Sequence, residues 1–433
     1  MASVASTARP GRAKGVARSR GAKRPVEYSI LFTATLCLLA TGAVMVYSAS
    51  SAEAVLGGSG DPSFYLKRYV LFALAGMAGL HLLVRGDLAL VYRVTPPLLV
   101  TGFALTIAVM VPGVGVTVNG ATRWLGAGPL QFQPSELLKL ALVLYAVRLL
   151  CERPDSVQTL KGLARPLLLV VGAACALLMK QPDMGTALVI CSAIGALLIA
   201  AGTPIRHLGV MGTVLAVLAL FLAVIEPYRM ARLTAFIDPF SDPGDTGFQA
   251  VQALTAIGSG GLFGVGLGES VQKIFYLPEA HTDMILAIIG EELGLAGILG
   301  VAALYAMIGY AGLRAAKAAK DRYSKLLAAG ITSLILAQAT LNFFAVLGMA
   351  PLTGVPLPFI SYGSTNLIVL LAGMGLLLNV AATGGRKAKA TSRVAEPLLR
   401  GIDGGRDGQD RDSRRRHGRA RGAGAGRGGR AAS

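Results

Sequence analysis

The stretch MILAIIGEELGLAGILGVAALYAMIGYAG, residues 284–312, decides the fold of this chain. It contains 29 residues, and only two of them, Glu291 and Glu292, carry a charge. A hydrocarbon core about 30 Å thick is crossed by roughly 20 apolar residues in an α-helix. The stretch is therefore long enough to cross a membrane as a single helix.

Comparable apolar stretches recur along most of the chain. They lie near residues 30–48, 69–84, 96–112, 135–151, 166–179, 185–202, 208–225, 284–312, 326–349 and 361–382. We therefore predict an all-α polytopic membrane protein with ten transmembrane helices. A large loop, residues 226–283, separates the seventh helix from the eighth. Its mixture of aromatic, charged, Gly and Pro residues indicates a working surface rather than a spacer.

The composition supports a membrane protein and excludes several soluble classes. Of 433 residues, 54% are hydrophobic and 15% are charged, whereas soluble proteins carry about 25% charged residues. The formal net charge of +18 is concentrated at the two ends, because residues 1–24 hold seven Lys or Arg and no acid, and residues 386–433 hold fourteen against five acids. A soluble enzyme, a nucleic-acid-binding domain and a disordered protein are therefore excluded.

The distribution of Lys and Arg predicts the orientation. With the N-terminus cytoplasmic, the basic loops near Arg85, Arg153, Arg206 and Lys317 all fall on the cytoplasmic side, as the positive-inside rule requires. This places 226–283 outside a plasma membrane. Residues 29–384 form the membrane domain, and both tails, 1–28 and 385–433, are cytoplasmic and disordered. The Arg/Gly-rich C-terminal tail is interpreted as a segment held near anionic lipid or as a docking site for a cytoplasmic partner.

Charged residues at membrane depth are candidates for function because they are costly there. Glu136 and Lys139 are three residues apart and share one helical face; they form an internal ion pair or act directly beside a charged substrate. Lys180 and Asp183 lie in a short turn between two helices. Asp183 has the simpler alternative of capping the helix that follows.

The glycine-rich stretch GSGGLFGVGLGES, residues 258–270, does not predict a nucleotide site. A nucleotide-binding loop follows a β-strand and begins a helix, whereas a membrane span and further loop surround this stretch. We interpret its glycines as positions of close backbone approach or of turns.

The stretch YLPEAHTDMILAIIGEELG, residues 276–294, contains the strongest catalytic candidate. Glu279, His281 and Asp283 lie where a loop enters a long apolar helix. These three residues are weak evidence for a metal site, because no second ligand cluster accompanies them. A carboxylate at the lip of an apolar cavity is a good general base, since partial desolvation raises its pKa. Helix capping is the alternative role for Asp283.

These segments together resemble the SEDS proteins (shape, elongation, division, sporulation), the membrane glycosyltransferases that polymerise peptidoglycan from lipid II. The matching segments are VMVYSASS (44–51), NGATRWLGAGPLQFQPSELLKL (119–140), KQPDMGTAL (180–188), RLTAFIDPFSDPGDTGFQAVQAL (232–254), residues 258–294 and TGVPLPFISYGSTN (353–366). YLPEAHTD, VMVYSASS and the long basic tail resemble the division members more than the elongation members.

The resemblance implies a set of functional residues. Asp283 matches the essential aspartate of the family, and Glu136 and Lys139 match its ion pair on helix four. Arg123, Lys180, Asp183 and Lys273 also fall in matching motifs. The chain departs from the pattern at residues 284–286, where Met-Ile-Leu replaces Phe-Ile-Phe, and at residues 361–366, where SYGSTN lacks the second glycine of SYGG.

The expected reaction is an inverting glycosyl transfer from a glycan on polyprenyl diphosphate to a sugar hydroxyl of lipid II. Asp283 is the expected base, and the departing diphosphate needs cationic partners. The candidate substrate-binding residues are Arg123, Lys180, Lys273, Glu136 and Lys139. A divalent cation could share this task, but the sequence shows no dedicated ligand cluster.

The resemblance also implies partners and a location. These are a class B penicillin-binding transpeptidase and other division proteins at the division septum. Two other functions stay open: a flippase that moves lipid II across the bilayer, and a scaffold without activity that recruits the transpeptidase.

Overall fold

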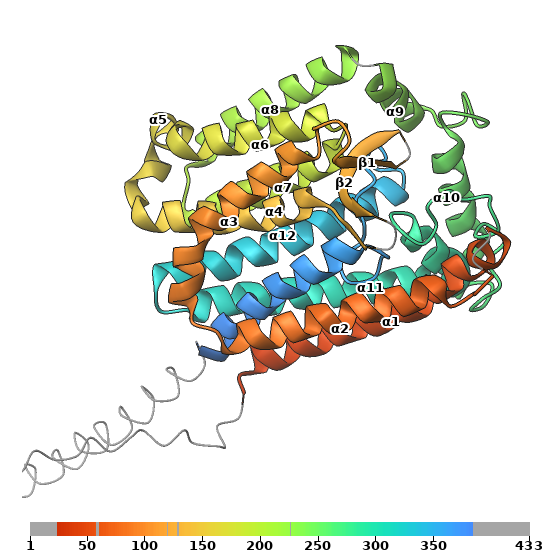
Figure 1. Ribbon diagram of the computed structural model, residues 1–433, viewed down its shortest axis with the longest axis horizontal. Helices are drawn as coiled ribbons and strands as arrows, with labels where there is room; N and C mark the ends of the chain where they lie inside the picture. Colours follow the sequence, from red (N-terminus) through yellow and green to blue (C-terminus); the bar gives the residue numbers. More distant parts are fainter. Residues whose placement is uncertain (1–23, 58–59, 119, 128–129, 226, 384–433) are drawn as a thin grey trace, which may run out of the picture.

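The computed structural model describes residues 24–57, 60–118, 120–127, 130–225 and 227–383. The predictions for residues 1–23 and 384–433, most of the two basic tails, lie outside the described residues. Within the described part the chain is mainly helical. Most long helices lie side by side with their axes roughly aligned (Figure 1). The helices are α1 (Val26–Leu56), α2 (Phe64–Arg85), α3 (Leu88–Ala108), α4 (Pro134–Glu152), α5 (Leu160–Leu163), α6 (Leu169–Lys180), α7 (Met184–Ala201), α8 (Ile205–Ile225), α9 (Pro227–Ile237), α10 (Phe248–Gly260), α11 (Ile285–Ala318), α12 (Arg322–Val346) and a last helix, Ser364–Thr383.

Eight helices of the described part are long and apolar enough to cross a membrane. They are Val26–Leu56, Phe64–Arg85, Leu88–Ala108, Leu160–Lys180, Met184–Ala201, Ile285–Ala318, Arg322–Val346 and Ser364–Thr383. The other two expected spans are helical too. However, α4 carries four charged side chains, and α8 contributes a shorter apolar helix, Ile205–Phe221. The chain is an integral membrane protein, and the count of ten spans stays a prediction.

The all-α prediction was wrong in one segment. Residues 115–132 form a three-stranded antiparallel sheet of β1 (Gly115–Val118), β2 (Ala121–Ala127) and β3 (Leu130–Phe132) in that order. Asn-Gly at residues 119–120 is a typical turn between two hairpin strands, and Gly120 has the positive φ of +75° that such turns require. The signal was present in the sequence but lies between two much stronger apolar stretches.

Local sequence sets several helix ends. The carboxylates of Asp87, Asp183 and Asp321 each accept a hydrogen bond from a backbone N–H in the first turn of α3, α7 and α12, respectively. The capping role considered for Asp183 is thereby confirmed. At its other end, α7 stops at Gly202, whose φ of +91° is favourable only for glycine.

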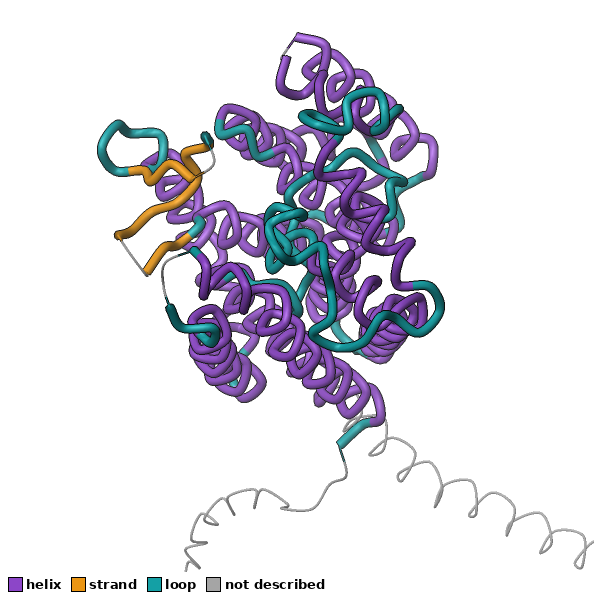
Figure 2. The backbone as a smooth tube through the Cα atoms, turned by 90° about the vertical axis from the view of Figure 1, so that its right-hand side faces the viewer, coloured by secondary structure: helices purple, strands orange, loops and turns teal. Residues whose placement is uncertain are grey.

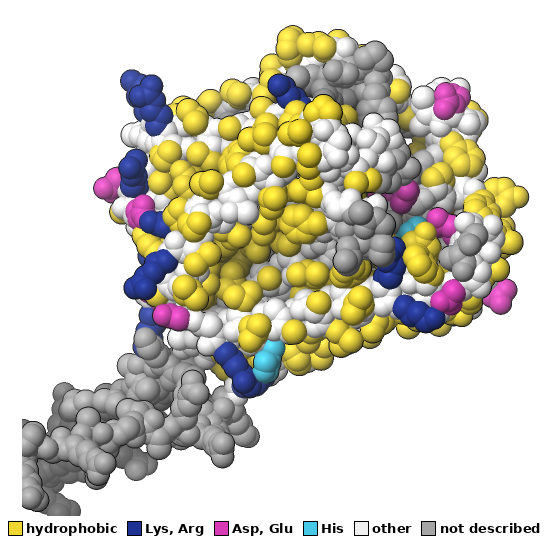
Figure 3. Space-filling model, in the orientation of Figure 1, with side chains coloured by type: hydrophobic (Ala, Val, Ile, Leu, Met, Phe, Trp, Pro, Cys, Tyr) yellow, Lys and Arg dark blue, Asp and Glu magenta, His cyan; other side chains and the backbone are white. Residues whose placement is uncertain are grey.

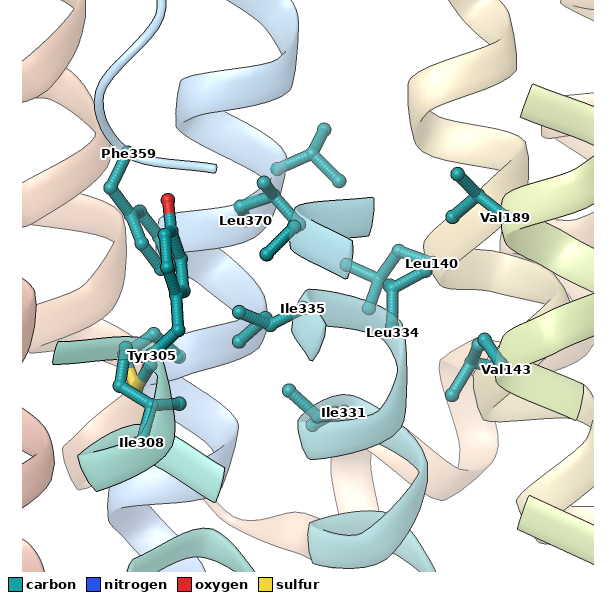
Figure 4. Packing of buried hydrophobic residues seen from close by; sticks show 14 of the residues in the cluster. Leu140, Val143, Val189, Tyr305, Ile308, Ile331, Leu334, Ile335, Phe359 and Leu370 are labelled. Atoms are coloured by element: carbon teal, nitrogen blue, oxygen red, sulfur yellow. The ribbon is translucent and has the colours of Figure 1, made fainter. Parts of the chain in front are cut away.

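Helix α12 lies at the centre of the bundle and packs against α4, α7 and α11. Figure 4 shows the side chains of Ile331, Leu334 and Ile335 from α12 among residues of the neighbouring helices, with Leu140 and Val143 of α4 on one side. All five residues are at most 6% exposed. This packing fixes α12 as the frame against which the segments at the end of the bundle are placed.

The two ends of the bundle differ in charge and in structure. We call the end that carries β1–β3, α9 and α10 the loop end, and the opposite end the basic end. Figure 2 shows the loop end, where irregular segments lie over the middle of the bundle and the sheet lies at its edge. In Figure 3 a column of Lys and Arg side chains marks the basic end, and a largely hydrophobic surface lies between the two ends.

Helices α1 and α11 show how far apart the two polar ends lie. Glu27 and Arg314 form an ion pair of 3.2 Å at the basic end. Ser48 donates a hydrogen bond of 2.6 Å to Glu292 toward the loop end. The two contacts are 21 residues apart on α1 and 22 on α11, or about 32 Å at 1.5 Å per residue. This separation matches a hydrocarbon core of about 30 Å.

The arrangement generates a prediction about topology. Cysteines introduced at the exposed positions Gly244, between α9 and α10, and Lys320, between α11 and α12, should report opposite sides of the membrane, because the positive-inside rule predicts that the basic end faces the cytoplasm. In intact cells, Gly244→Cys should react with a membrane-impermeant thiol reagent and Lys320→Cys should not. The parent chain with its four native cysteines is the control. Labelling of Lys320→Cys but not of Gly244→Cys would show that the chain has the opposite orientation to the predicted one.

Candidate active site

A cavity of about 1970 Å³ occupies the space between the loop end and the helices α6, α7 and α8. Its polar part is lined by Tyr65, Arg68, Arg123, Trp124, Gln131, Gln133, Lys180, Arg232, Gln249, Glu279, His281, Thr282, Asp283, Tyr362 and Asn366. Its apolar part is lined by Leu168, Val171, Ala176, Met179, Ile194, Ile199, Leu208, Met211, Leu215 and Leu218. One continuous space therefore joins charged groups to a hydrocarbon-like wall.

Asp283 lies in the polar part of this cavity. The residue at the N-cap of α11 is Met284, and no side chain caps this helix, so the capping alternative for Asp283 is not supported. The Thr282 hydroxyl lies 3.2 Å from Asp283 Oδ1 and 2.9 Å from Glu279 Oε2. Burial, and then the negative charge of Glu279, raise the pKa of Asp283 to about 6, against the opposing effects of Thr282 and the Arg232 charge.

The turn that carries Asp283 is held through its backbone on two sides. The carbonyl oxygen of His281 accepts a hydrogen bond of 3.0 Å from the Tyr362 N–H. The carbonyl oxygen of Asp283 accepts one of 2.7 Å from the Asn342 side chain. The His281 ring lies 4.4 Å from the Tyr65 ring, measured between centroids, and is also close to the Tyr362 ring. The turn that carries the carboxylate is therefore held by three elements besides its own, namely α2, α12 and the segment before the last helix.

Two of the three predicted cations line the cavity. Lys180, in the last turn of α6, is exposed, and within the described residues no carboxylate lies within 4 Å of its ammonium group. Arg123, on β2, donates a hydrogen bond of 2.9 Å from Nε to the Gln181 carbonyl and another to the Pro182 carbonyl. These bonds fix the Arg123 guanidinium at the turn between α6 and α7, beside Lys180.

The third cation, Lys273, does not line the cavity. Its ammonium group lies 2.9 Å from Glu292 Oε1 and 2.6 Å from the Gly268 carbonyl oxygen. Lys273 is 8% exposed and Glu292 is fully buried. A buried carboxylate requires a partner, and Lys273 supplies it. The structure thus places Lys273 where the segment between α10 and α11 attaches to α1 and α11, outside the cavity.

Glu136 and Lys139 form the ion pair that their spacing predicts. Lys139 Nζ lies 2.9 Å from Glu136 Oε2, and both side chains are 2% exposed. Lys139 also donates a hydrogen bond of 2.9 Å to Gln338 Oε1 on α12. Neither partner lines the cavity, so the structure does not support a direct role beside a charged substrate there.

The glycine-rich stretch provides close backbone approach, as expected. Helix α11 is broken at Gly294, which has φ of +69°. The N–H groups of Leu295 and Ala296 donate to the carbonyls of Gly261 and Leu262 instead of to their own helix. A Cβ at Gly264 would lie 2.1 Å from the Glu292 carbonyl oxygen. Any side chain at 264 would therefore separate this loop from α11.

Sequence reasoning missed two cations of the cavity, Arg68 and Arg232. Arg68 lies in the first turns of α2, and Arg232 lies on α9 and donates a hydrogen bond of 2.8 Å to the Leu352 carbonyl. A usable signal existed. Both arginines fall on the predicted outer side, where the positive-inside rule predicts few basic residues, so their presence needed a functional explanation.

The described part of the chain contains no group of three or more His, Cys, Asp or Glu side chains that could hold a metal ion. Among described residues the cavity joins two carboxylates, Glu279 and Asp283, to four cations, Arg68, Arg123, Lys180 and Arg232. This arrangement suits a ligand that carries negative charge at one end and a long apolar group at the other.

The fold and the cavity together define an integral membrane protein with an amphipathic binding space. Comparison with known proteins identifies the family: residues 28–385 match the model of the FtsW, RodA and SpoVE family, described as cell cycle proteins. The chain belongs to this family.

Relatives and solved structures agree with this assignment. A probable peptidoglycan glycosyltransferase FtsW from Geobacter sp. (strain M18) is 41% identical over 351 residues, covering 81% of this chain and 95% of the relative. The stage V sporulation protein E of Bacillus subtilis (strain 168) is 38% identical, covering 81% and 96%. A chain from a peptidoglycan synthase complex that coordinates polymerization and crosslinking superposes with a TM-score of 0.67 at 30% identity, covering 81% and 96%. RodA of Thermus thermophilus gives 0.58 at 28% identity, covering 81% and 95%.

The buried pair generates a prediction about Glu136 and Lys139. Glu136→Gln or Lys139→Met alone leaves one buried charge uncompensated, which typically costs about 3–5 kcal/mol. Each single variant should therefore lower the thermal unfolding temperature strongly, and the double variant should be more stable than the worse single variant. Thermal unfolding of the four purified proteins measures this coupling. If the loss of stability in the double variant equals the sum of the losses in the two single variants, the two residues act separately.

Proposed function

We propose that this chain is a peptidoglycan glycosyltransferase that polymerises lipid II, with Asp283 as the general base. The observation that carries the proposal is the position of the Asp283 carboxylate in the charged part of a cavity whose other part is apolar. The names of the relatives support it, because several of them are probable peptidoglycan glycosyltransferases.

The proposed chemistry needs one proton acceptor and one anion site. The acceptor hydroxyl of lipid II attacks the anomeric carbon of the growing glycan, and its proton passes to Asp283. The bond between the anomeric carbon and the diphosphate oxygen breaks, and the polyprenyl diphosphate leaves with the electron pair. Attack from the face opposite the leaving group inverts the configuration at that carbon.

The cations of the cavity suit the departing diphosphate. Lys180 and the Arg123 guanidinium lie together at the turn between α6 and α7. We assign them to the diphosphate, because charge that develops on a leaving group is best stabilised by donors already in place. Lys273, Glu136 and Lys139 are assigned structural roles instead, since they are buried in ion pairs outside the cavity.

The apolar part of the cavity suits the polyprenyl chain. Its walls come from α6, α7 and α8 and contain aliphatic and Met side chains. It extends as far as Leu160 and Ala164, which precede α6 on the side of the basic end. A long hydrocarbon chain in this space would stay out of water while the diphosphate reaches Lys180.

The cavity extends along much of the bundle, and this length is the one observation that favours the flippase alternative. A flippase must carry a disaccharide and a diphosphate through the midplane, which requires polar lining there. The lining residues between Leu168 and Leu218 are instead almost entirely apolar. The glycosyltransferase therefore fits better, because only its lipid tail needs to occupy this part.

The remaining parts of the proposal concern topology and partners. We place ten spans in the plasma membrane at the division septum, with both termini cytoplasmic and the loop end outside. A class B penicillin-binding transpeptidase and other division proteins are the proposed partners, since a solved relative belongs to a complex that couples polymerization to crosslinking. A scaffold without activity would predict no polymerisation by any purified form.

Removal of the base tests the proposal directly. Asp283→Asn keeps the size of the side chain but cannot accept the proton, so polymerisation should fall by about 10²-fold or more. Because Asp283 does not cap α11, the variant should unfold at the same temperature as the wild type. The measurement is glycan-chain formation from lipid II by matched amounts of both proteins with their transpeptidase. Near-normal chains from Asp283→Asn would overturn the assignment.

The pH dependence provides a second test. With a pKa raised to about 6 by burial and by Glu279, Asp283 is protonated and inactive as a base below this pH and ionised above it. The value of kcat/KM should therefore fall as the pH drops through about 6. A profile measured between roughly pH 3.5 and 8, which includes both this value and the usual Asp pKa of about 4, checks this. An acid limb near the usual pKa of about 4 would contradict it.

A further inference from the structure

The segment Pro351–Ile360 lies between α12 and the last helix, and more than half of its residues are buried although it belongs to no helix or sheet. Val355, Leu357, Phe359 and Ile360 are at most 4% exposed. Buried carbonyl groups must find hydrogen-bond donors. Here the donors are side chains of other elements, which serve the carbonyls as follows: Arg232 to Leu352, Asn342 to Val355, Gln338 to Pro356, Tyr305 to Pro358 and Tyr69 to Phe359.

Asn342 differs from the other donors because it also binds Asp283. Its Nδ2 donates a hydrogen bond of 2.7 Å to the Asp283 carbonyl oxygen and one of 2.8 Å to the Val355 carbonyl oxygen. The side chain is 2% exposed. Both amide hydrogens are thereby used, so the Asp283 backbone is tied to Pro351–Ile360 through one buried group.

Pro351–Ile360 also passes beside the Asp283 carboxylate. Gly354 has φ of +66°, and a Cβ built on it would lie 3.8 Å from Asp283 Oδ2. A shift of Val355 would therefore move Gly354, which lies beside the carboxylate. A shift of the Asp283 carbonyl would move the carboxylate itself. Asn342 fixes both at once.

We propose that Asn342 is the positioning residue of the reaction, holding Asp283 and the Val355 carbonyl in one fixed relation. The inference rests on the proposed role of Asp283. Only a group with two N–H donors on one atom can serve both carbonyls in this geometry, and an ionised carboxylate or an aliphatic side chain has none. Loss of the amide leaves two buried carbonyls without this donor and frees the Asp283 backbone to move.

Gln338 links Pro351–Ile360 to the buried ion pair of Glu136 and Lys139. It lies one turn before Asn342 on α12 and donates hydrogen bonds of 2.8 Å to the Pro356 carbonyl and 3.0 Å to Asn366 Oδ1. Its own carbonyl oxygen accepts the bond from Lys139. The pair of Glu136 and Lys139 thus reaches Pro351–Ile360 through a single residue, although it lies outside the cavity.

The chain offers a matched control for Asn342. Asn379, on the last helix, is 7% exposed and donates from Nδ2 to two backbone carbonyls, those of Leu83 and Gly86, each at 2.8 Å. Its chemistry is the same as that of Asn342, but it joins the last helix to the end of α2 and does not line the cavity. Replacement of either residue by Leu removes a two-carbonyl clamp.

The test compares Asn342→Leu with Asn379→Leu in the full chain with its cognate transpeptidase. Both variants should lose thermal stability. Asn342→Leu should lower kcat for lipid II polymerisation by about 10- to 100-fold with KM near wild type, because misplacement of the reacting group acts on the chemical step. Asn379→Leu should keep the wild-type kcat. Asn342→Ser, which keeps one hydrogen-bond donor, should lose less activity than Asn342→Leu. If Asn342→Leu does not fold, the comparison with Asn379→Leu is made with Asn342→Ser.

Several outcomes would overturn the proposal. Equal kcat for the two Leu variants would show that Asn342 is only structural, and a change confined to KM would place it in substrate binding. Asp283→Asn measured in parallel separates this result from the proposed function. If Asp283→Asn is inactive and Asn342→Leu is fully active, only the positioning role fails. If Asp283→Asn is active, the assignment of the base fails.

Discussion

Every backbone polar group that leaves a helix inside this apolar bundle must find a partner within the protein, because neither lipid nor aliphatic side chains can supply one. The chain meets this requirement at two breaks. At Gly294 the interrupted turn of α11 exchanges hydrogen bonds with the backbone of the glycine-rich loop. At Pro351–Ile360 side chains of α2, α9, α11 and α12 serve the carbonyls. Asp283 precedes both breaks in the sequence, and Asn342 ties its backbone carbonyl to the second break.

The sequence predicted those features that depend on neighbours along the chain. The apolar stretches predicted the helices, the three-residue spacing of Glu136 and Lys139 predicted their ion pair, and Asp283 was chosen because a loop meets an apolar helix there. Features that depend on distant partners could not be predicted. Lys273 looked like a substrate cation until its buried partner Glu292 was known, and nothing in the sequence indicates that Asn342 reaches the Asp283 backbone, 59 residues away.

The buried ion pairs explain why charge density alone is a poor guide to the site. Two buried pairs, Glu136 with Lys139 and Glu292 with Lys273, hold four charged groups outside the cavity. Such pairs contribute little net stability, but breaking one is costly, so each fixes the relative position of the segments that it joins. The cations that line the cavity, Arg68, Arg123, Lys180 and Arg232, are more exposed than these pairs, which leaves them accessible to an anionic ligand.

The proposed reaction makes two opposite electrostatic demands on one cavity. The base needs a raised pKa, while the departing diphosphate needs cations, and a cation close to the base lowers its pKa. The chain separates the two demands. Burial and Glu279 raise the pKa of Asp283 and outweigh Arg232, the cation that opposes them. Arg123 and Lys180 stand on other elements, at the turn between α6 and α7. A cation at position 279 would help to bind the diphosphate but would lower the pKa of Asp283 and make it a weaker base.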